Sequence, residues 1–578
     1  VLVIGEVRSS IRGSEDVVVV ENGWTKRVPI ASLEGKSIDG IMVPTLDENY
    51  KIRLTKLSGF VKHPPRKKLL EVTTRTGRAV TVTHDHSLFT ADGFWVTPVE
   101  TNKLKPGDKI VLPALMPCGY NDLEFIDVTE IVPESRLDGV DGLVRKAISV
   151  LGWKKATKIC EIRCGDIYNY FRRHQKTRIP IRAFKALMNE ARIQYSLDGI
   201  KVKHGNCTPV PARIPVNEKF CRFLGYYVSE GFLANGGVTI TNSNRKILRD
   251  IVLISRDLFG IKPYIRWVHG LGRSKQVLIQ SSPLARLISR LGCGRTCNEK
   301  RAPPLIFGLS KQKIASFLKA LYSGDGSFSA SKRSGNAVRY STTSRKLAED
   351  VMYLLLTHGI VARVRKCKKG KLHRNDIWEV EFKQRDAVRT FLDKVGFVQK
   401  RPSMISRAWS HSTANVATFS EGQLRKNSRL KRKYRHLARF CRCSKYYLQR
   451  IVADKGNEIS EQLRKFAVGE FYLDEIKEIK EVELKKPESV YDLSVNPSEN
   501  FVGGFGGIFL HNTEARTLYE AMRIGAAGNS VMGTIHGATT RDVFDRVVYD
   551  LGIPPTSFKA TDAIIVAAPI RPGGSVSR

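Results

Sequence analysis

An internal repeat between residues 216 and 400 constrains the fold more than any other feature of this 578-residue chain. The first copy reads FLGYYVSEG and then TNSNRKILRDIVLISRDLFGI; the second reads FLKALYSGDG and then STTSRKLAEDVMYLLLTHGI. In each copy an apolar helical stretch ends in an acid-glycine pair, and a β segment, an Arg-Lys helix start and a closing Gly-Ile follow. Two copies of one α/β unit predict a pseudo-symmetric pair.

Each copy places a carboxylate and a glycine at the end of its first helix, as Glu230-Gly231 and Asp325-Gly326. Small residues that would let these helices pack closely are Gly225, Ser229, Ala320 and Gly324. If the helices lie side by side, the two carboxylates converge, and their repulsion favours a cation between them. Because Mg²⁺ takes carboxylate and phosphate oxygens, Glu230 and Asp325 are candidate metal ligands for phosphodiester chemistry. The alternative is a pair of core helices that end in solvated acids.

The charge of the chain points to a polyanionic partner. Lys and Arg number 96 against 56 Asp and Glu, which gives a formal net charge of +40. Self-repulsion on this scale favours binding to nucleic acid, although a merely basic protein is the alternative. No apolar run is long enough to span a membrane. The ten cysteines lack zinc-knuckle spacing, so we expect free thiols in a reducing cytoplasm rather than a metal site.

The remaining chain divides by its local pattern. Short β-branched runs broken by Gly, Pro and Asn-Gly fill the region up to about residue 115 and return from Val490, which predicts all-β structure. Two basic stretches, 140–215 and 405–468, have the rhythm of helix-turn-helix motifs. They could extend a DNA contact or serve as helical linkers, and the sequence does not separate these readings.

The repeated segments FLGYYVSEG and FLKALYSGDG resemble the two LAGLIDADG motifs of dodecapeptide (DOD-type) homing endonucleases. The resemblance implies αββαββα-type repeats in 216–400, Mg²⁺ as cofactor, and site-specific cleavage of a long double-stranded DNA target. It assigns the metal to Glu230, which replaces the usual Asp, and to Asp325. Lys300, in the segment EKRAPP, resembles the lysine-proline block of the family and is a further catalytic candidate.

The flanks of this repeat resemble the splicing blocks of inteins, which often contain such endonucleases. SIRGSEDVVVVENG from Ser10 resembles the first block, and Thr83-His84-Asp85-His86 resembles the Thr-x-x-His block. VYDLSV and ENFVGGFGGIFLHN, followed by Thr513, resemble the C-terminal blocks. The resemblance implies an all-β Hint (horseshoe) splicing domain formed by residues 10–135 and 469–512 and split by the endonuclease.

At the N-terminal junction, the resemblance makes Ser10 the first nucleophile. Its Oγ would attack the Ser9 carbonyl and convert the amide to an ester. Thr83 and His86 would polarise that peptide bond, and His86 would protonate the leaving nitrogen. Serine is a permitted variant at this position, and an engineered Cys-to-Ser change would look identical.

At the C-terminal junction, Thr513 would take over the acyl group, with Asp492 placed to shuttle protons. Asn512 would then cyclise with help from His511 and release the intein, and no cofactor is implied for splicing. A histidine often precedes the Asn-Phe of this block, whereas Glu499 stands there in this chain. The sequence leaves open what assists Asn512.

Removal of 10–512 joins the flanks as VLVIGEVRS-TEARTLYEAMRIGAAGNSVMGTIHG. This segment resembles the Walker B and histidine-box region of type II/type IV secretion ATPases. The resemblance implies that Glu6 orients the attacking water or its metal and that His536 senses the γ-phosphate. The chain has no G-x-x-x-x-G-K-[ST] loop, so ATP and Mg²⁺ would act only in a complete host, which the family implies is a homo-oligomer.

Together these patterns predict a multidomain precursor: N-extein 1–9, the split splicing domain, the endonuclease, and an α/β C-extein 513–578. The leading hypothesis combines autocatalytic splicing with a site-specific endodeoxyribonuclease. One alternative is a DNA-binding module in which splicing or nuclease activity has decayed. A working secretion motor is a third hypothesis, and the missing phosphate loop argues against it.

Overall fold

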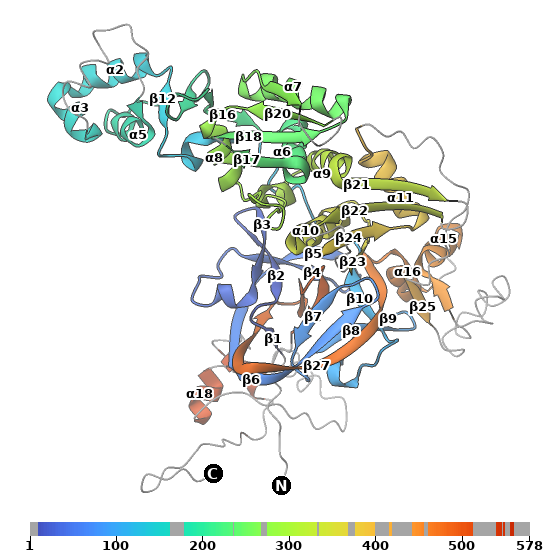
Figure 1. Cartoon of the computed structure of the whole chain (residues 1–578). Coiled ribbons are helices and arrows are strands. Elements are labelled where there is room, and N and C mark those ends of the chain that lie inside the picture. The colour runs from blue at the N-terminus through green and yellow to red at the C-terminus, as the bar shows by residue number, and fades with distance from the viewer. Residues whose placement is uncertain are drawn as a thin grey trace. The chain divides into compact units, whose positions relative to one another are not determined.

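The computed structural model describes residues 10–161, 179–234, 236–267, 274–331, 335–367, 376–398, 415–418, 442–455 and 460–512, with short stretches between 539 and 564. Contacts divide the chain into two compact units. The first contains 1–19, 27–112 and 414–578, and the second contains 20–26 and 113–413. The structure is mixed α/β with several separate sheets (Figure 1). The flank residues Glu6, Thr513 and His536 lie outside the described residues.

The first unit is built on a 13-stranded sheet in the order β1-β7-β6-β27-β10-β8-β29-β28-β2-β4-β5, with β3 on β2 and β9 on β8. Its strands are β1 (Ile11–Arg12), β2 (Asp16–Glu21), β3 (Trp24–Pro29), β4 (Met42–Leu46), β5 (Ile52–Lys56), β6 (Gly59–Thr74), β7 (Ala79–Val82), β8 (Ser87–Asp92), β9 (Trp95–Glu100), β10 (Lys109–Pro113), β27 (Phe471–Ser494), β28 (Asn500–Gly503) and β29 (Ile508–His511). A short 3-10 helix, η1 (Ile30–Leu33), follows β3.

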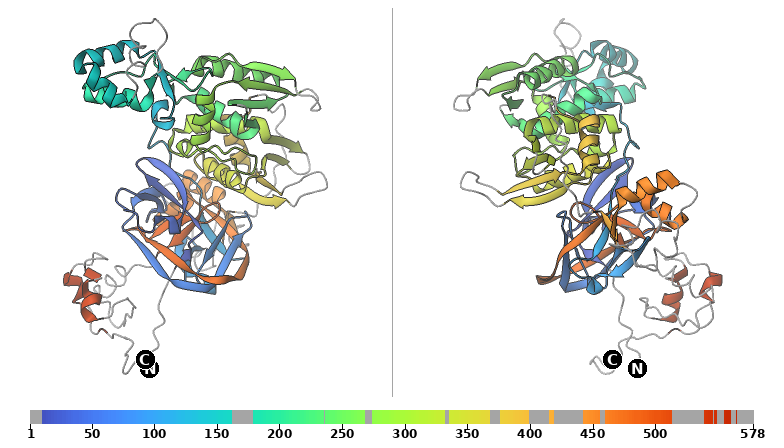
Figure 2. Two further views of the ribbon diagram at one scale, coloured as in Figure 1. Left: turned by 60° about the vertical axis from the view of Figure 1, so that its left-hand side comes forward. Right: turned by 90° about the vertical axis from the view of Figure 1, so that its right-hand side faces the viewer.

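The long strands β6 and β27 join the two halves of this unit. They pair antiparallel over most of their length, from Ile476 opposite Thr74 to Ser494 opposite Gly59. Leu69, Leu484 and Val490 pack as one buried cluster across the pair. Figure 2 shows the orange strand of residues 471–494 within the same body as the blue strands near the start of the chain. Residues at opposite ends of the sequence therefore share one fold.

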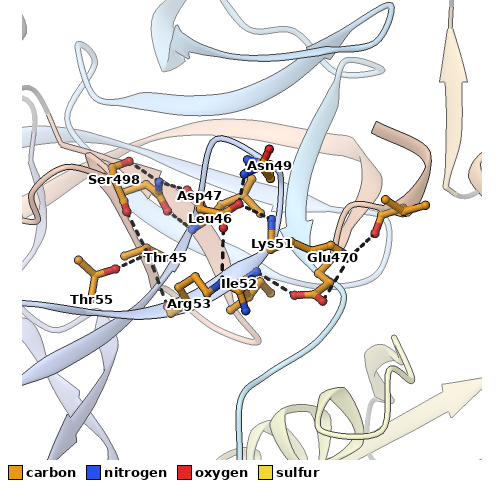
Figure 3. Close-up of polar contacts among 12 residues, drawn as sticks. Thr45, Leu46, Asp47, Asn49, Lys51, Ile52, Arg53, Thr55, Glu470 and Ser498 are labelled. Carbon is orange, nitrogen blue, oxygen red and sulfur yellow. Dashed lines mark hydrogen bonds and ion pairs between the residues drawn. The ribbon is translucent and has the colours of Figure 1, made fainter. Parts of the chain in front are cut away.

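The β4–β5 hairpin provides a second link between these halves (Figure 3). The Leu46 amide donates to Asn500 Oδ1 at 2.7 Å, and Asn500 Nδ2 returns a bond to the Leu46 carbonyl at 2.9 Å. Thr45 Oγ1 donates to Ser498 Oγ at 3.3 Å, and the Ile52 amide donates to Glu470 at 2.8 Å. The bonds of Ser498 and Asn500 fix the turn that precedes β28, because its buried polar groups have partners in the hairpin. The bond of Glu470 ties the start of β27 to the same hairpin.

Two helices and a small sheet, together with the short helices α18 (Thr540–Asp545) and α19 (Pro555–Phe558), also belong to the first unit. α15 (Lys445–Lys455) and α16 (Glu461–Val468) lie in the predicted helix-turn-helix stretch 405–468, beside β25 (Val416–Thr418) and β26 (Arg442–Ser444). The connection between the two helices lies outside the described residues. Lys445 is buried, and its ammonium donates to the carbonyls of Gly469 at 2.5 Å and Phe471 at 2.6 Å. That lysine therefore has a structural contact rather than an exposed position for DNA.

The second unit contains the repeat, with the predicted element order in both copies. The first copy is α6 (Glu218–Glu230), β17 (Gly231–Ala234), β18 (Gly237–Asn242), α7 (Arg245–Phe259), β19 (Tyr264–Trp267), β20 (Lys275–Ile279) and α8 (Ser282–Arg290). After η3 (Pro304–Gly308), the second copy is α9 (Lys311–Asp325), β21 (Gly326–Ser331), β22 (Gly335–Thr342), α10 (Arg345–Leu356), β23 (Arg363–Cys367), β24 (Ile377–Phe382) and α11 (Arg385–Lys394). The sheet orders β17-β18-β20-β19 and β21-β22-β24-β23 are equivalent.

Side-chain caps start the corresponding helices of the two copies. Asn244 Oδ1 accepts from the Lys246 amide before α7, and Ser344 Oγ accepts from the Leu347 amide before α10. Such caps satisfy amides that have no partner within the helix. The helix α7 ends where Gly260 adopts φ +66°, a left-handed conformation that glycine adopts without strain. The repeated polar–Arg–Lys pattern therefore marks true helix starts.

Residues 113–215 belong to the second unit, so the first unit ends short of the predicted boundary at 135. β11 (Phe125–Asp127) pairs with β16 (Arg213–Pro215), which ties this region to the repeat side of the chain. The rest of the region comprises α1 (Val128–Ile131), β12 (Arg136–Asp138), α2 (Asp141–Leu151), α3 (Trp153–Cys160), β13 (Ile179–Pro180), α5 (Ile181–Glu190), β14 (Lys201–Lys203) and β15 (Val210–Pro211). Across the described residues, no helix has the length and apolar character needed to cross a membrane.

Candidate functional site

Ser10 is buried at the start of β1 and is bonded to the Thr-x-x-His segment. Its backbone N–H donates to Thr83 Oγ1 at 3.0 Å, and the Thr83 N–H donates to the Ser10 carbonyl at 2.9 Å. In the sheet, Ile11 lies opposite Val82 of β7 on one side and opposite Tyr491 of β27 on the other. Ser10 Oγ is buried and makes no hydrogen bond within the part of the chain that the structure describes. Its hydroxyl is therefore buried next to the sheet and is not engaged by a neighbouring polar group of the described residues.

His86 lies in the turn after Thr83 and is completely buried. Its N–H donates to the Thr83 carbonyl at 3.2 Å, and its carbonyl accepts from the Thr101 amide at 2.8 Å. Burial, with a smaller contribution from nearby His511, lowers the pKa of His86 to about 3. The imidazole is therefore neutral at physiological pH and can both donate and accept a proton.

The C-terminal junction lies in the same unit. β29 pairs with β8 at Leu510 opposite Leu88 and His511 opposite Ser87, close to the segment that carries His86. The side chain of Asn512 is 1 % exposed, and its N–H donates to the Glu499 carbonyl at 3.0 Å. The structure thus brings Ser10, Thr83, His86, His511 and Asn512 into one body.

Asp492 belongs to β27, beside the strand that begins at Ser10. It follows Tyr491, which is the register partner of Ile11, and it pairs with Val61 on β6. Its side chain is largely buried, and Oδ1 accepts a hydrogen bond from the Leu493 amide at 2.9 Å. The predicted proton carrier is therefore part of the same sheet as the N-terminal nucleophile.

The predicted carboxylate pair lies in the second unit, where α6 packs along α9. A Cβ added at Gly225 would lie 2.8 Å from the Ala320 Cβ, and one at Gly324 would lie 2.9 Å from the Glu230 Cγ. Both distances are shorter than a real Cβ tolerates, so the two glycines permit the close approach. Glu230 and Asp325 consequently end adjacent helices at the same end of the interface.

Both carboxylates lie in a buried environment, and the charge of Glu230 acts on Asp325. Burial and then the Glu230 charge raise the pKa of Asp325 to about 7, although Lys300 acts in the opposite direction. Burial also raises the pKa of Glu230, while a hydrogen bond from Asn242 Nδ2 to Glu230 Oε1 at 3.1 Å lowers it. A cation between the two oxygens would relieve this repulsion.

Lys300 is 5 % exposed and lies beside the pair. Its Nζ donates to the Tyr227 carbonyl at 2.8 Å and sits 3.4 Å from the centroid of the Tyr227 ring. Burial lowers the pKa of Lys300 to about 8, although Cys293 and Asp325 raise it. A lysine with this pKa exchanges a proton near neutral pH far more readily than an exposed one.

The donor set fits a hard cation that keeps most of its own water. Among the described residues, no group of three or more His, Cys, Asp or Glu side chains could hold a metal. Mg²⁺ often binds through one or two carboxylates plus water and phosphate oxygens, so two carboxylates suffice. The hydroxyl of Tyr340 is also buried and without a hydrogen bond to any described residue, and its pKa is raised by burial and by Asp325. These groups suit a hydrated site.

Sequence reasoning missed two residues that the structure places beside the carboxylates: Asn242 and Tyr227 contact the carboxylate pair and its lysine. Glu499, which the sequence marked as a departure from the intein pattern, lies against the C-terminal junction. Alignment of the two repeat copies could have drawn attention to Asn242, which lies in the sequence TNSN and is the last residue of β18. Tyr227 acts partly through its backbone carbonyl, which no side-chain pattern reveals.

Comparison with known proteins gives a family match over most of the chain. Residues 18–512 match the family model described as the intein splicing domain. An uncharacterised protein of Methanocaldococcus jannaschii is 27 % identical over 348 residues, covering 58 % of this chain and 37 % of that protein. A DNA polymerase of Thermococcus hydrothermalis is 23 % identical over 575 residues, covering 88 % and 31 % respectively. The chain thus spans about a third of the length of these curated relatives.

Two solved structures also match parts of the chain. A transcription factor IIB mini-intein is 26 % identical, with a TM-score of 0.17, over 18 % of this chain and 70 % of that one. I-DmoI in complex with DNA and Mn is 15 % identical, with a TM-score of 0.24, over 32 % of this chain and 99 % of that one. Scores this low do not establish a function for this chain.

Proposed function

This chain belongs to the intein splicing domain family, and on that premise we propose that it excises residues 10–512 by autocatalytic protein splicing and joins its flanks. The observation that carries the proposal is the meeting of both predicted junctions in one unit. Ser10 donates a hydrogen bond to Thr83 near the start of the domain. Asn512 follows β29 of the same sheet and donates a hydrogen bond to the Glu499 carbonyl. The family match also ends at Asn512, the residue that would cyclise.

In the first step, Ser10 Oγ attacks the Ser9 carbonyl, so a C–O ester bond forms and the Ser9–Ser10 amide bond breaks. Thr83 Oγ1 holds the leaving nitrogen through the N–H bond of 3.0 Å. The neutral imidazole of His86 can take the hydroxyl proton and return it to the new amine. Support for this role comes from the burial and the depressed pKa of His86.

In the later steps, Thr513 Oγ attacks the ester and takes over the acyl group, with Asp492 as proton carrier. The Asn512 side-chain nitrogen then attacks its own carbonyl, which breaks the bond to Thr513 and frees the intein. An ester-to-amide rearrangement joins the flanks. Only side chains of this chain take part, so splicing needs no cofactor.

Expression of the unmodified chain followed by intact-mass analysis tests the proposal. We expect a free fragment of residues 10–512 and a ligated product of residues 1–9 and 513–578. The Asn512→Ala variant should release no C-terminal fragment, and Ser10→Ala should release no N-terminal fragment. An intact precursor from the unmodified chain after prolonged incubation would rule out active splicing.

We infer a second activity, site-specific cleavage of double-stranded DNA, from the carboxylate pair. Glu230 and Asp325 would hold Mg²⁺, which supplies charge neutralisation at the scissile phosphate. Lys300, with its pKa lowered to about 8, can accept or donate a proton beside that phosphate. The net charge of +40 supplies the attraction to DNA.

The DNA test uses a duplex that encodes residues 1–9 joined directly to 513–578, because a homing site spans the uninterrupted junction. We expect Mg²⁺-dependent cutting that Glu230→Gln or Asp325→Asn abolishes. The matched control Asp257→Asn changes an exposed carboxylate on α7 that is paired with Lys219, and it should cut normally. Binding of this duplex without cutting would favour the alternative, a DNA-binding module with decayed nuclease activity.

We propose that the flanks belong to a secretion-type ATPase, on the joined sequence alone. The curated relatives have unrelated names, which supports an insert shared among unrelated hosts rather than one host activity. The full-length spliced host should hydrolyse ATP with Mg²⁺, and Glu6→Gln should abolish turnover. Absence of ATP hydrolysis by the complete host would refute this assignment.

A further inference from the structure

Glu499 occupies a turn that is fixed from both sides. Its N–H donates to the Val495 carbonyl at 2.8 Å, and its φ of +50° is left-handed, which is uncommon for a residue with a side chain. The next residue, Asn500, is held by Leu46, and the preceding Ser498 is held by Thr45 (Figure 3). The position of Glu499 is therefore set by the β4–β5 hairpin.

From this turn, Glu499 makes two contacts with the last residues of the splicing domain. Its backbone carbonyl accepts the Asn512 N–H at 3.0 Å, and its Oε2 lies 3.8 Å from His511 Nε2. The register of β28 and β29 places Asn500 opposite His511, which brings the two side chains to the same end of the strands. Both side chains are mostly buried, at 17 % exposure for His511 and 26 % for Glu499.

The other nitrogen of His511 is free for chemistry. Nδ1 is buried and has no hydrogen bond to any described residue. The ring of Phe89 packs edge-on against the imidazole, with 5.4 Å between centroids. A carboxylate at Nε2 favours the tautomer with its proton on that nitrogen, which leaves the Nδ1 lone pair as the acceptor.

We propose that Glu499 is a positioning residue for Asn512 cyclisation, and that it acts by orienting His511; the inference rests on the proposed splicing function. In this step the bond from Asn512 Nδ2 to its own carbonyl carbon forms, and the bond to the Thr513 nitrogen breaks. The proton leaves Nδ2, passes through His511 Nδ1 and ends on the Thr513 amine. Glu499 thus replaces the histidine that often stands at this place in inteins.

The test measures cleavage at the N-terminal junction and cleavage at the C-terminal junction separately, in the full-length chain. Glu499→Gln keeps the shape and removes the charge. We expect release of the C-terminal flank to slow by at least about tenfold, while hydroxylamine still releases residues 1–9 at the parent rate. Glu499→His should restore release, because histidine tolerates a positive φ and offers a ring nitrogen. The control Glu478→Gln removes an exposed carboxylate of β27 paired with Lys480 and should change neither rate.

Equal slowing of both ends in Glu499→Gln, or unchanged C-terminal release, would overturn the role of Glu499. If the unmodified chain releases neither end, the splicing proposal itself fails. A second measurement then still tests the contact: ¹⁵N NMR of histidine-labelled full-length Asn512→Ala. We expect His511 to carry its proton on Nε2 and to lose this preference when Glu499→Gln is added. An unchanged tautomer would contradict the orientation.

Discussion

Ser10 and Thr83 form a reciprocal pair of hydrogen bonds: the Ser10 N–H donates to Thr83 Oγ1 at 3.0 Å, and the Thr83 N–H donates to the Ser10 carbonyl at 2.9 Å. The first bond is made by a side chain and holds the nitrogen that leaves in the first splicing step. The second is made by the backbone, so substitutions of Thr83 other than proline keep it. The contribution of the hydroxyl can therefore be tested without breaking the sheet.

Thr83→Val should slow ester formation at Ser10 by about 10- to 100-fold, because a buried N–H without its acceptor costs about 1–3 kcal/mol. Thr83→Ser keeps the hydroxyl and should stay near the parent rate. The measurement is hydroxylamine-dependent release of residues 1–9 in an Asn512→Ala background. Thr90→Val removes a surface hydroxyl on β8 that donates to the Thr97 carbonyl on β9, and it serves as control. Parent-like release from Thr83→Val would exclude a role for the hydroxyl.

The buried His86 predicts a loss of stability in acid. Its pKa falls from 6.5 to about 3 on folding, so below pH 6.5 the unfolded chain gains a proton that the folded chain does not. Between pH 7 and pH 4.5, the free energy of unfolding of His86→Gln should therefore fall by about 2 kcal/mol less than that of the parent. Urea unfolding of the Asn512→Ala chain at both pH values measures this difference. His84→Gln, at an exposed imidazole nearby, should follow the parent, and an equally acid-sensitive His86→Gln would contradict the prediction.

The fold of the unit that contains the repeat can largely be predicted from its sequence, because the signals for its helices and strands are local. The repeat predicts the order of helices and strands, and the Arg-Lys pattern predicts the helix starts that Asn244 and Ser344 cap in the structure. The acid-glycine pairs predict where Glu230 and Asp325 fall at helix ends. A helix ends where its own sequence dictates, so these features need no knowledge of distant residues.

The splicing half follows less completely because its contacts are distant in sequence. The pairing of β6 with β27 joins residues far apart, and no local pattern specifies their register. The same is true of Glu499, whose contact with His511 depends on the β28–β29 register and on Leu46. The unit boundary at Leu112 also depends on long-range pairing, so no local pattern specifies it.

The raised pKa of Asp325 predicts how metal use changes with pH. Its pKa of about 7 lies above the ordinary 3.8, so near pH 6 most molecules carry a protonated carboxyl that cannot ligate Mg²⁺. The Mg²⁺ concentration for half-maximal DNA cleavage should fall by about fivefold between pH 6 and pH 7, by about a further twofold up to pH 8, and level off above. Asp257→Asn should give the parent profile. A flat profile over this range would show that the pair is already ionised at pH 6.

The close approach of α6 and α9 predicts that Gly225→Ala separates the two activities. The added Cβ would lie 2.8 Å from the Ala320 Cβ, so the helices must move apart, at a cost of about 1–3 kcal/mol. Since Glu230 and Asp325 end these helices, DNA cleavage should fall steeply, whereas splicing in the other unit should continue.

Gly142→Ala is the matched control for this change, because a Cβ at that helical glycine of α2 meets nothing within 4 Å. It should be neutral or stabilising by up to about 1 kcal/mol, since alanine favours a helix over glycine. Thermal unfolding in the Asn512→Ala background measures the stability of both variants. DNA cleavage and splicing are assayed in the parent background. Full cleavage by Gly225→Ala would show that the two carboxylates do not depend on close packing of α6 against α9.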